Sequence, residues 1–173
     1  PAAPLRSREA VSVGVRSNGT GGSTDWASLD VEAAYLSPDD SSAAKVASCT
    51  VQVQGEPKRP FLVRRAFTPA TTPGQARVYV TALGLYELLI NGKKVGDQLL
   101  APGWRTYNHY LDYQTFDVGP LLVEGENEIS AWVAEGWYSG RLGFLGESQL
   151  SSMLPTELCV ANCRSSCNQA GDG

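Results

Sequence analysis

Apolar and polar residues alternate in short runs along the middle of the chain, which is the pattern of half-buried β-strands. The runs cover residues 62–67, 77–83, 86–90, 93–95, 111–118 and 127–134, and each is bounded by Gly, Pro or Asn. Asn91-Gly92 separates two of them, and both residues tolerate the positive φ angles that a tight hairpin needs. Strands at this spacing, without competing helical periodicity, predict an all-β fold, a jelly-roll β-sandwich.

The flanking segments are less regular. Residues 11–36 alternate through Val11, Val13 and Val15 and again through Leu29 and Val31, but two or three strands are too few to be stable alone. Residues 37–60 are rich in Ser, Asp and Ala, and 41–60 predict a linker with one short strand at 49–54. Apolar residues at helical spacing in 150–158, limited by Pro155, predict a short helical piece, and the chain from Arg164 onward is expected to fray. The predicted organisation is 1–40, a partial β segment; 41–60, a linker; 61–146, the sandwich; and 147–173, a divergent tail.

Charge and hydropathy remove several classes of partner. The net charge is −4 and Lys and Arg form no cluster larger than a pair, so the basic surface that nucleic acids require is missing. No run approaches the roughly 20 apolar residues of a membrane helix, so no membrane partner is expected. Asn18-Gly19-Thr20 is an N-glycosylation acceptor, and the chain starts at Pro1 without an initiator Met, which together favour an extracellular, secreted protein or a fragment.

Four cysteines leave the redox chemistry open. Cys49, Cys159, Cys163 and Cys167 allow three disulfide connectivities. The four-residue spacing of the last three does not match a zinc or iron–sulfur pattern, and His109 is the single histidine. An irregular tail with disulfides or free thiols is the simplest interpretation.

Two segments, 102–113 and 135–141, combine aromatic rings with planar polar groups. Sugars offer C–H faces to aromatic rings and hydroxyls to amide, carboxylate and guanidinium groups, so such loops predict a carbohydrate site. The competing interpretation is that individual rings, Trp132, Tyr113 or Trp137, belong to the core. The candidate sugar-binding residues are Asn91, Trp104, Arg105, Tyr107, Asn108, Trp137 and Tyr138.

Catalytic patterns are weak by comparison. No Gly-x-Ser-x-Gly motif accompanies His109, and no pair stands out among the acids, of which Asp97 and Glu135 are the most notable. No EF-hand-like run is present, so metal ligands cannot be assigned, although scattered loop oxygens leave Ca²⁺ as a candidate.

The order and spacing of several pieces across about 85 residues resemble the N-terminal β-sandwich module of α-L-rhamnosidases, glycoside hydrolase family 78. The pieces are Arg65-Ala66-Phe67, Ala82-Leu83-Gly84-Leu85-Tyr86-Glu87, Ile90-Asn91-Gly92-Lys93-Lys94-Val95-Gly96-Asp97, Leu100-Ala101-Pro102-Gly103-Trp104, Tyr113-Gln114-Thr115-Phe116-Asp117-Val118 and Gly136-Trp137-Tyr138-Ser139-Gly140-Arg141. Residues 25–40 are similar to the end of the fibronectin-III-like domain that precedes this module.

The resemblance implies a non-catalytic, lectin-like module that binds L-rhamnose or a related sugar, in some relatives with Ca²⁺. Hydrolysis in the family belongs to an (α/α)₆ barrel, which this chain does not match. A structural protein derived from a truncated rhamnosidase, or a small glycosidase, are the alternatives. The family pattern stops after Gly146, so the missing edge of the sandwich is expected to be filled by residues 49–54, by the tail, or by a second chain in a homo-oligomer.

Overall fold

The computed structural model describes residues 4–41, 43–49, 58–69, 76–107, 109–138, 140–142, 147–148 and 157–165, within two compact units, Pro1–Ser42 and Ala43–Gly173. The first unit is a long antiparallel hairpin of β1 (Ala10–Val15) with β4 (Ala27–Glu32), extended by β2 (Asn18–Gly19) and β3 (Gly22–Ser23). A single 3₁₀ turn, η1 (Pro38–Asp40), follows. Because only two strands pair here, Val13, Val15 and Leu29 stay more than half exposed. The likeness of this hairpin to a fibronectin-III domain stays a prediction.

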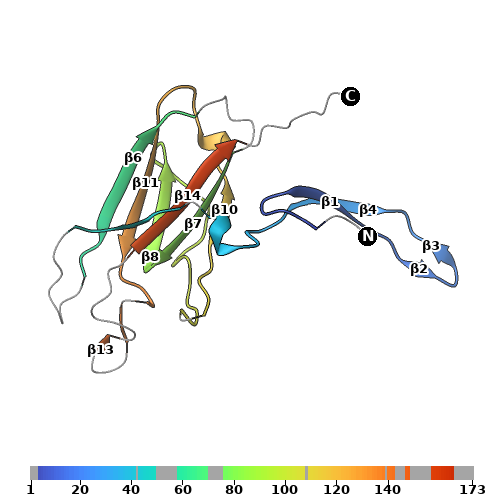
Figure 1. Cartoon of the computed structure of the whole chain (residues 1–173), viewed down its shortest axis with the longest axis horizontal. Helices are drawn as coiled ribbons and strands as arrows, with labels where there is room; N and C mark the ends of the chain where they lie inside the picture. The colour runs from blue at the N-terminus through green and yellow to red at the C-terminus, as the bar shows by residue number, and fades with distance from the viewer. Residues whose placement is uncertain are drawn as a thin grey trace. The chain divides into compact units, whose positions relative to one another are not determined.

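The second unit is a sandwich of two four-stranded sheets in which every strand pairing is antiparallel (Figure 1). One sheet has the order β10-β7-β14-β5, with β10 at Gln114–Asp117, β7 at Ala76–Leu83, β14 at Glu157–Ser165 and β5 at Lys45–Ala47. The other has the order β6-β11-β8-β9, with β6 at Phe61–Phe67, β11 at Asn127–Ala134, β8 at Leu85–Ile90 and β9 at Lys93–Lys94. A ribbon of β12 (Arg141–Leu142) and β13 (Glu147–Ser148) and the 3₁₀ turn η2 (Gly119–Leu121) complete the unit. The predicted all-β sandwich is confirmed.

The core lies between the sheets because strand alternation turns one face of each strand inward. Most of the buried apolar side chains come from four strands: Ala76, Val78, Val80 and Ala82 of β7, Tyr86, Leu88 and Ile90 of β8, Ala131 and Val133 of β11, and Leu158 of β14. Val95, Ala101 and Val118, from the connections, complete the core. Within the described residues no helix is long and apolar enough to cross a membrane.

The tail closes the sandwich. β14 pairs with β7 on one side and with β5 on the other, so the last described strand of the chain occupies an interior position in its sheet. Leu158 is 2% exposed and belongs to the core. The expectation that the tail supplies the missing pairing is therefore confirmed.

Two expectations about these segments are wrong. Residues 157–165 form a strand instead of a helical piece, because β7 and β5 offer ladder partners that a local periodicity argument cannot detect, and Arg164 and Ser165 belong to this strand instead of a frayed end. Strand β5 lies at 45–47, ahead of the predicted strand at 49–54, of which residues 50–54 lie outside the described residues, as do Leu150, Met153 and Leu154.

The connections gather at two opposite ends of the sandwich. At one end β7 runs into β8, β11 runs into 135–138, and 101–113 leads into β10; we call this the aromatic end. At the other, the Asn91-Gly92 turn meets the loop 121–126 ahead of β11, and we call this the turn end. The six residues of β8 separate the ends by roughly 17–20 Å.

Candidate functional site

The aromatic end begins where residue 101 pairs with β8. The backbone N–H of Tyr86 donates to the carbonyl of Ala101 at 3.0 Å, and the Ala101–Pro102 peptide is cis. The Tyr86 hydroxyl then crosses the sandwich and donates to Gln114 Oε1 at 2.7 Å, while Gln114 Nε2 donates to the carbonyl of Pro102 at 3.4 Å. Burial raises the pKa of the Tyr86 hydroxyl. Gln114 therefore ties both sheets to the start of the aromatic loop.

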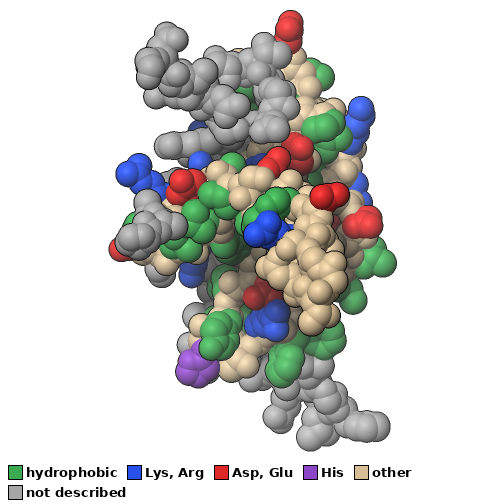
Figure 2. Space-filling view, turned by 90° about the vertical axis from the view of Figure 1, so that its right-hand side faces the viewer, with side chains coloured by type: hydrophobic (Ala, Val, Ile, Leu, Met, Phe, Trp, Pro, Cys, Tyr) green, Lys and Arg blue, Asp and Glu red, His purple; other side chains and the backbone are tan. Residues whose placement is uncertain are grey.

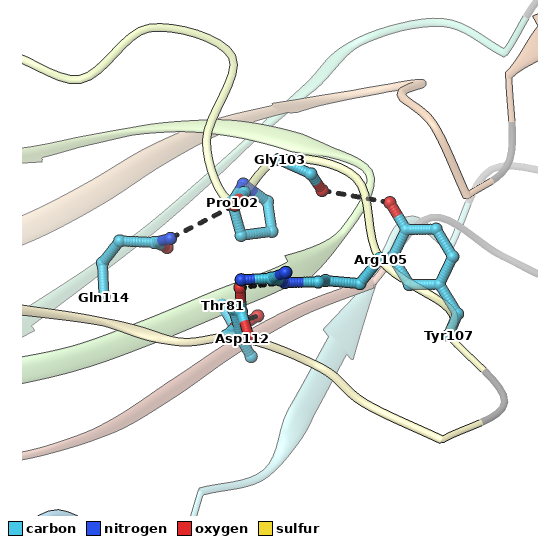
Figure 3. A network of polar contacts seen from close by, with 7 residues as sticks. All are labelled: Thr81, Pro102, Gly103, Arg105, Tyr107, Asp112 and Gln114. Carbon is cyan, nitrogen blue, oxygen red and sulfur yellow. Dashed lines mark hydrogen bonds and ion pairs between the residues drawn. The ribbon is translucent and has the colours of Figure 1, made fainter.

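The loop is held by further polar contacts, shown in Figure 3. The Arg105 guanidinium lies against the carboxylate of Asp112, and the Thr81 hydroxyl donates to the Asp112 carbonyl. The Tyr107 hydroxyl donates to the carbonyl of Gly103 at 3.1 Å. Burial raises the pKa of the Tyr107 hydroxyl, and a hydrogen bond with the backbone of Arg105 opposes that shift. These contacts fix the loop over the last residues of β7 before any ligand arrives.

The second aromatic loop is positioned by a glycine. A Cβ at Gly136 would lie 2.8 Å from the carbonyl carbon of Gly84 and 2.8 Å from Leu85 Cγ, so no larger residue fits there without displacing backbone. This close approach places Trp137 and Tyr138 directly after β11. The Tyr138 ring meets the Tyr107 ring edge-on, with centroids 5.1 Å apart and planes at 77°. The structure thus brings the two predicted segments together.

An open hollow of about 460 Å³ lies at the start of β10. We call it the β10 hollow, and it is lined by Gln98, Leu111, Asp112, Tyr113, Gln114 and Thr115. Its volume is within the range of small-molecule sites, and its wall is mostly polar. Arg105 adjoins it through Asp112.

The predicted site residues divide into three groups. Trp104 is 62% exposed and Trp137 38% exposed, and they lie with Arg105, Tyr107 and Tyr138 at the aromatic end. Asn91 lies at the turn end: its Nδ2 donates to the Leu121 carbonyl and to Asn127 Oδ1, and its Oδ1 accepts from the backbone N–H of Glu128. Its amide is engaged in bracing the hairpin and lies apart from the other candidates. Asn108 lies outside the described residues.

Sequence reasoning did not assemble the hollow. Asp112 falls in the predicted segment 102–113, and Gln114 and Thr115 fall in one of the pieces that carry the family resemblance, but nothing in the sequence shows that they share one surface with Gln98. The two acids noted in the sequence, Asp97 and Glu135, do not line the hollow. Asp97 is exposed, and Glu135 accepts a hydrogen bond from the backbone N–H of Lys58. Burial lowers the pKa of the Lys58 amine, and Glu135 counteracts part of that shift.

Figure 2 shows both Lys and Arg side chains and Asp and Glu side chains on the face that it draws. Among the residues that the structure describes, no group of three or more His, Cys, Asp or Glu side chains could hold a metal ion. Cys49 is exposed and its thiol is free.

Comparisons with known proteins point to one enzyme class. A family described as the alpha-L-rhamnosidase N-terminal domain matches residues 71–162. The α-L-rhamnosidase of Streptomyces avermitilis is 39% identical over 124 residues, which are 72% of this chain and 11% of that protein. Native α-L-rhamnosidase from Aspergillus terreus has a similar structure, with a TM-score of 0.83 and 40% identity over 92% of this chain and 19% of that chain.

A further solved structure, the Streptomyces avermitilis α-L-rhamnosidase complexed with L-rhamnose, has a TM-score of 0.52 and 30% identity over 85% of this chain and 16% of that chain. The chain spans about a tenth of the length of the curated relatives it matches, between 11% and 13% for the first three.

Proposed function

We propose, from the premise that this chain belongs to the α-L-rhamnosidase N-terminal domain family, that its sandwich binds a carbohydrate and does not itself hydrolyse one. The expected ligand is L-rhamnose or a related neutral or deoxy sugar. The site is the aromatic end, which carries Trp104, Arg105, Tyr107, Trp137 and Tyr138. Arg105 bonds Asp112 of the β10 hollow.

One observation carries the proposal: exposed aromatic rings lie on a braced loop, and Arg105 of that loop bonds Asp112, which lines the polar β10 hollow. Aromatic side chains bury on average, so a Trp104 that is 62% exposed on a braced loop leaves its ring face free for a ligand. The loop is already ordered by the contacts of Arg105, Tyr107 and Gln114, so binding need not pay for its immobilisation.

The chemistry of the residues suits a sugar. The indole of Trp104 can stack on a C–H face of the sugar. A 6-deoxy sugar also has a methyl group, which the paired rings of Tyr107 and Tyr138 can cover. The Arg105–Asp112 pair is exposed on both sides, so it contributes little to folding stability. Since a guanidinium has five N–H donors, Arg105 can bond Asp112 and a sugar hydroxyl at the same time.

The alternatives are less well supported. A purely structural role is most compatible with buried Trp104 and Trp137, and both are exposed. A glycosidase needs two facing carboxyl groups, and among the six described residues that line the hollow Asp112 alone carries one.

Calorimetric titration of the full chain with L-rhamnose, D-glucose, D-galactose and D-mannose, with and without a chelator, tests the proposal. We expect saturable heat with L-rhamnose. Trp104→Ala should weaken binding at least tenfold, whereas Trp26→Ala, which removes an equally exposed tryptophan from the first unit, should leave it unchanged. An aryl α-L-rhamnoside should release no aryl alcohol.

Two outcomes would overturn the proposal. The absence of heat with every sugar would remove the binding function. Turnover of the aryl rhamnoside that Asp112→Asn abolishes would replace binding with catalysis.

A further inference from the structure

A third exposed tryptophan of the sandwich lies away from the loops, on the outer face of a sheet. Trp132 is in β11, between Ala131 and Val133, whose side chains are fully buried on the inner face. Alternation therefore turns the indole outward, where it is 51% exposed. The sequence-based interpretation of Trp132 as a core residue is wrong for this reason.

Its neighbours across the sheet are given by the strand register. Trp132 pairs with Leu62 of β6 on one side and with Glu87 of β8 on the other, and Leu62 is 46% exposed. Side chains at directly opposed positions lie about 5 Å apart, so the three form one row across the sheet. We call this row and its charged neighbours the Trp132 face.

Charged hydrogen-bonding groups rim the row. The Lys94 amine donates to the Glu87 carboxylate at 2.8 Å, and both side chains are exposed. Arg64, which pairs with Ser130 in the next row, is exposed as well. The row thus has one carboxylate, that of Glu87, and two cationic donors on neighbouring positions, Lys94 and Arg64.

The size of this apolar surface identifies its occupant. A stable protein interface buries about 1,200 Å² or more in total, built around a larger hydrophobic centre. Here the exposed apolar groups of the row are one half-covered indole and one leucine, and a whole Trp side chain buries only about 150–250 Å². One pyranose ring, by contrast, matches one indole face and brings hydroxyls to a rim of donors and acceptors.

We propose that the Trp132 face is a second carbohydrate-binding site, independent of the aromatic end, at which a neutral sugar ring stacks on the indole of Trp132. Glu87 accepts hydrogen bonds from sugar hydroxyls, while Lys94 and Arg64 donate to them. A single open platform of this kind binds weakly, with dissociation constants of about 1 mM or above.

Nuclear magnetic resonance of the full ¹⁵N-labelled chain tests this site. Four tryptophans give four indole N–H signals, each assigned by one Trp→Phe variant. The signal of Trp132 should shift saturably with L-rhamnose or D-galactose at concentrations up to about 100 mM, a range that detects millimolar binding. Glu87→Gln and Arg64→Ala should weaken this response several-fold, and Lys93→Ala, in the neighbouring turn, should not.

The experiments can refute the two proposed carbohydrate sites independently of each other. Trp104→Ala should abolish the response at the aromatic end and leave the Trp132 signal responsive. A Trp132 signal that moves with neither sugar in the folded native protein would overturn the second site whatever happens at the first. A dimer in sedimentation that Trp132→Ala dissolves would overturn it too, because the occupant would then be a second copy of the chain.

Discussion

Asn127 holds the turn end together, and replacing it with alanine should unfold that end. The side chain is 1% exposed and uses all of its hydrogen-bonding capacity. Its Oδ1 accepts from Asn91 Nδ2 at 2.8 Å and from the backbone N–H of Val123 at 2.9 Å. Its Nδ2 donates to the carbonyls of Val123 at 2.8 Å and of Gly125 at 3.0 Å. One amide thus joins the hairpin turn, the loop and the start of β11.

The loss in free energy of unfolding caused by Asn127→Ala can be estimated by counting these hydrogen bonds. Each contributes about 1 kcal/mol net, so the four set an upper value of about 4 kcal/mol. Part of this free energy is recovered in the variant, because the loop around Gly125 is exposed and water can hydrogen-bond to the backbone groups that lose Asn127. Asn127→Ala should therefore lower the free energy of unfolding by about 2–4 kcal/mol, a large share of the ~5–15 kcal/mol of a typical domain.

Urea unfolding followed by far-ultraviolet circular dichroism measures this loss. Glu124→Ala, an exposed change in the same loop, is the control and should stay within about 0.5 kcal/mol of the parent. Combining Asn127→Ala with Asn91→Ala should cost less than the sum of the single changes, because the two share one hydrogen bond. A loss under about 1 kcal/mol for Asn127→Ala would refute the reasoning. So would a weakening of sugar binding by Asn91→Ala with unchanged stability.

Three further changes test other parts of the molecule. Tyr86→Phe should cost about 1–2 kcal/mol at pH 7 by leaving Gln114 Oε1 without its donor. Because burial raises the folded-state pKa of Tyr86, its contribution is complete below the unfolded pKa near 10 and is lost as the pH rises further. Urea midpoints from pH 7 to 11 should therefore show the gap to the parent narrowing above pH 10, and a constant gap would contradict this. Leu158→Ala should cost about 2–4 kcal/mol and Val46→Ala, its exposed cross-strand neighbour, less than about 1, whereas equal effects would exclude a core role for the tail. Asn18, exposed on β2, should carry a glycan after secretion from a eukaryotic host, detected by an endoglycosidase-sensitive mass shift that Asn18→Gln removes; an unmodified secreted chain would contradict the predicted glycosylation of Asn18.

The central strands could be predicted from the sequence because local rules and tertiary structure agree there. Alternation and the Asn91-Gly92 turn place the strands within a few residues of β6, β7, β8 and β11. The phase of the alternation also decides the burial of Trp132: its neighbours Ala131 and Val133 face the core, so the ring cannot. Treating that ring by the average burial of tryptophan, apart from its strand, produced the error.

Long-range strand pairing accounts for the remaining differences between the sequence-based predictions and the structure. Nothing near Leu158 distinguishes a strand from a short helix, since the answer depends on partners over 70 residues away in β7 and over 100 away in β5. The same holds for the candidate site. The aromatic residues could be chosen from composition, but the assignment of Asn91 to the turn end and of Asp112 to the β10 hollow required the register of the sheets.

The interior position of β14 has a consequence for how this molecule is made. During synthesis the strands β5 to β11 emerge first, yet one of the two sheets lacks its connecting strand until residues 157–165 have left the ribosome. Until then β7 presents an unsatisfied backbone edge and β5 has no neighbour, so the nascent chain must remain protected from association while it waits. A chain that stopped near residue 146 would lack β14 and would keep that edge of β7 open permanently.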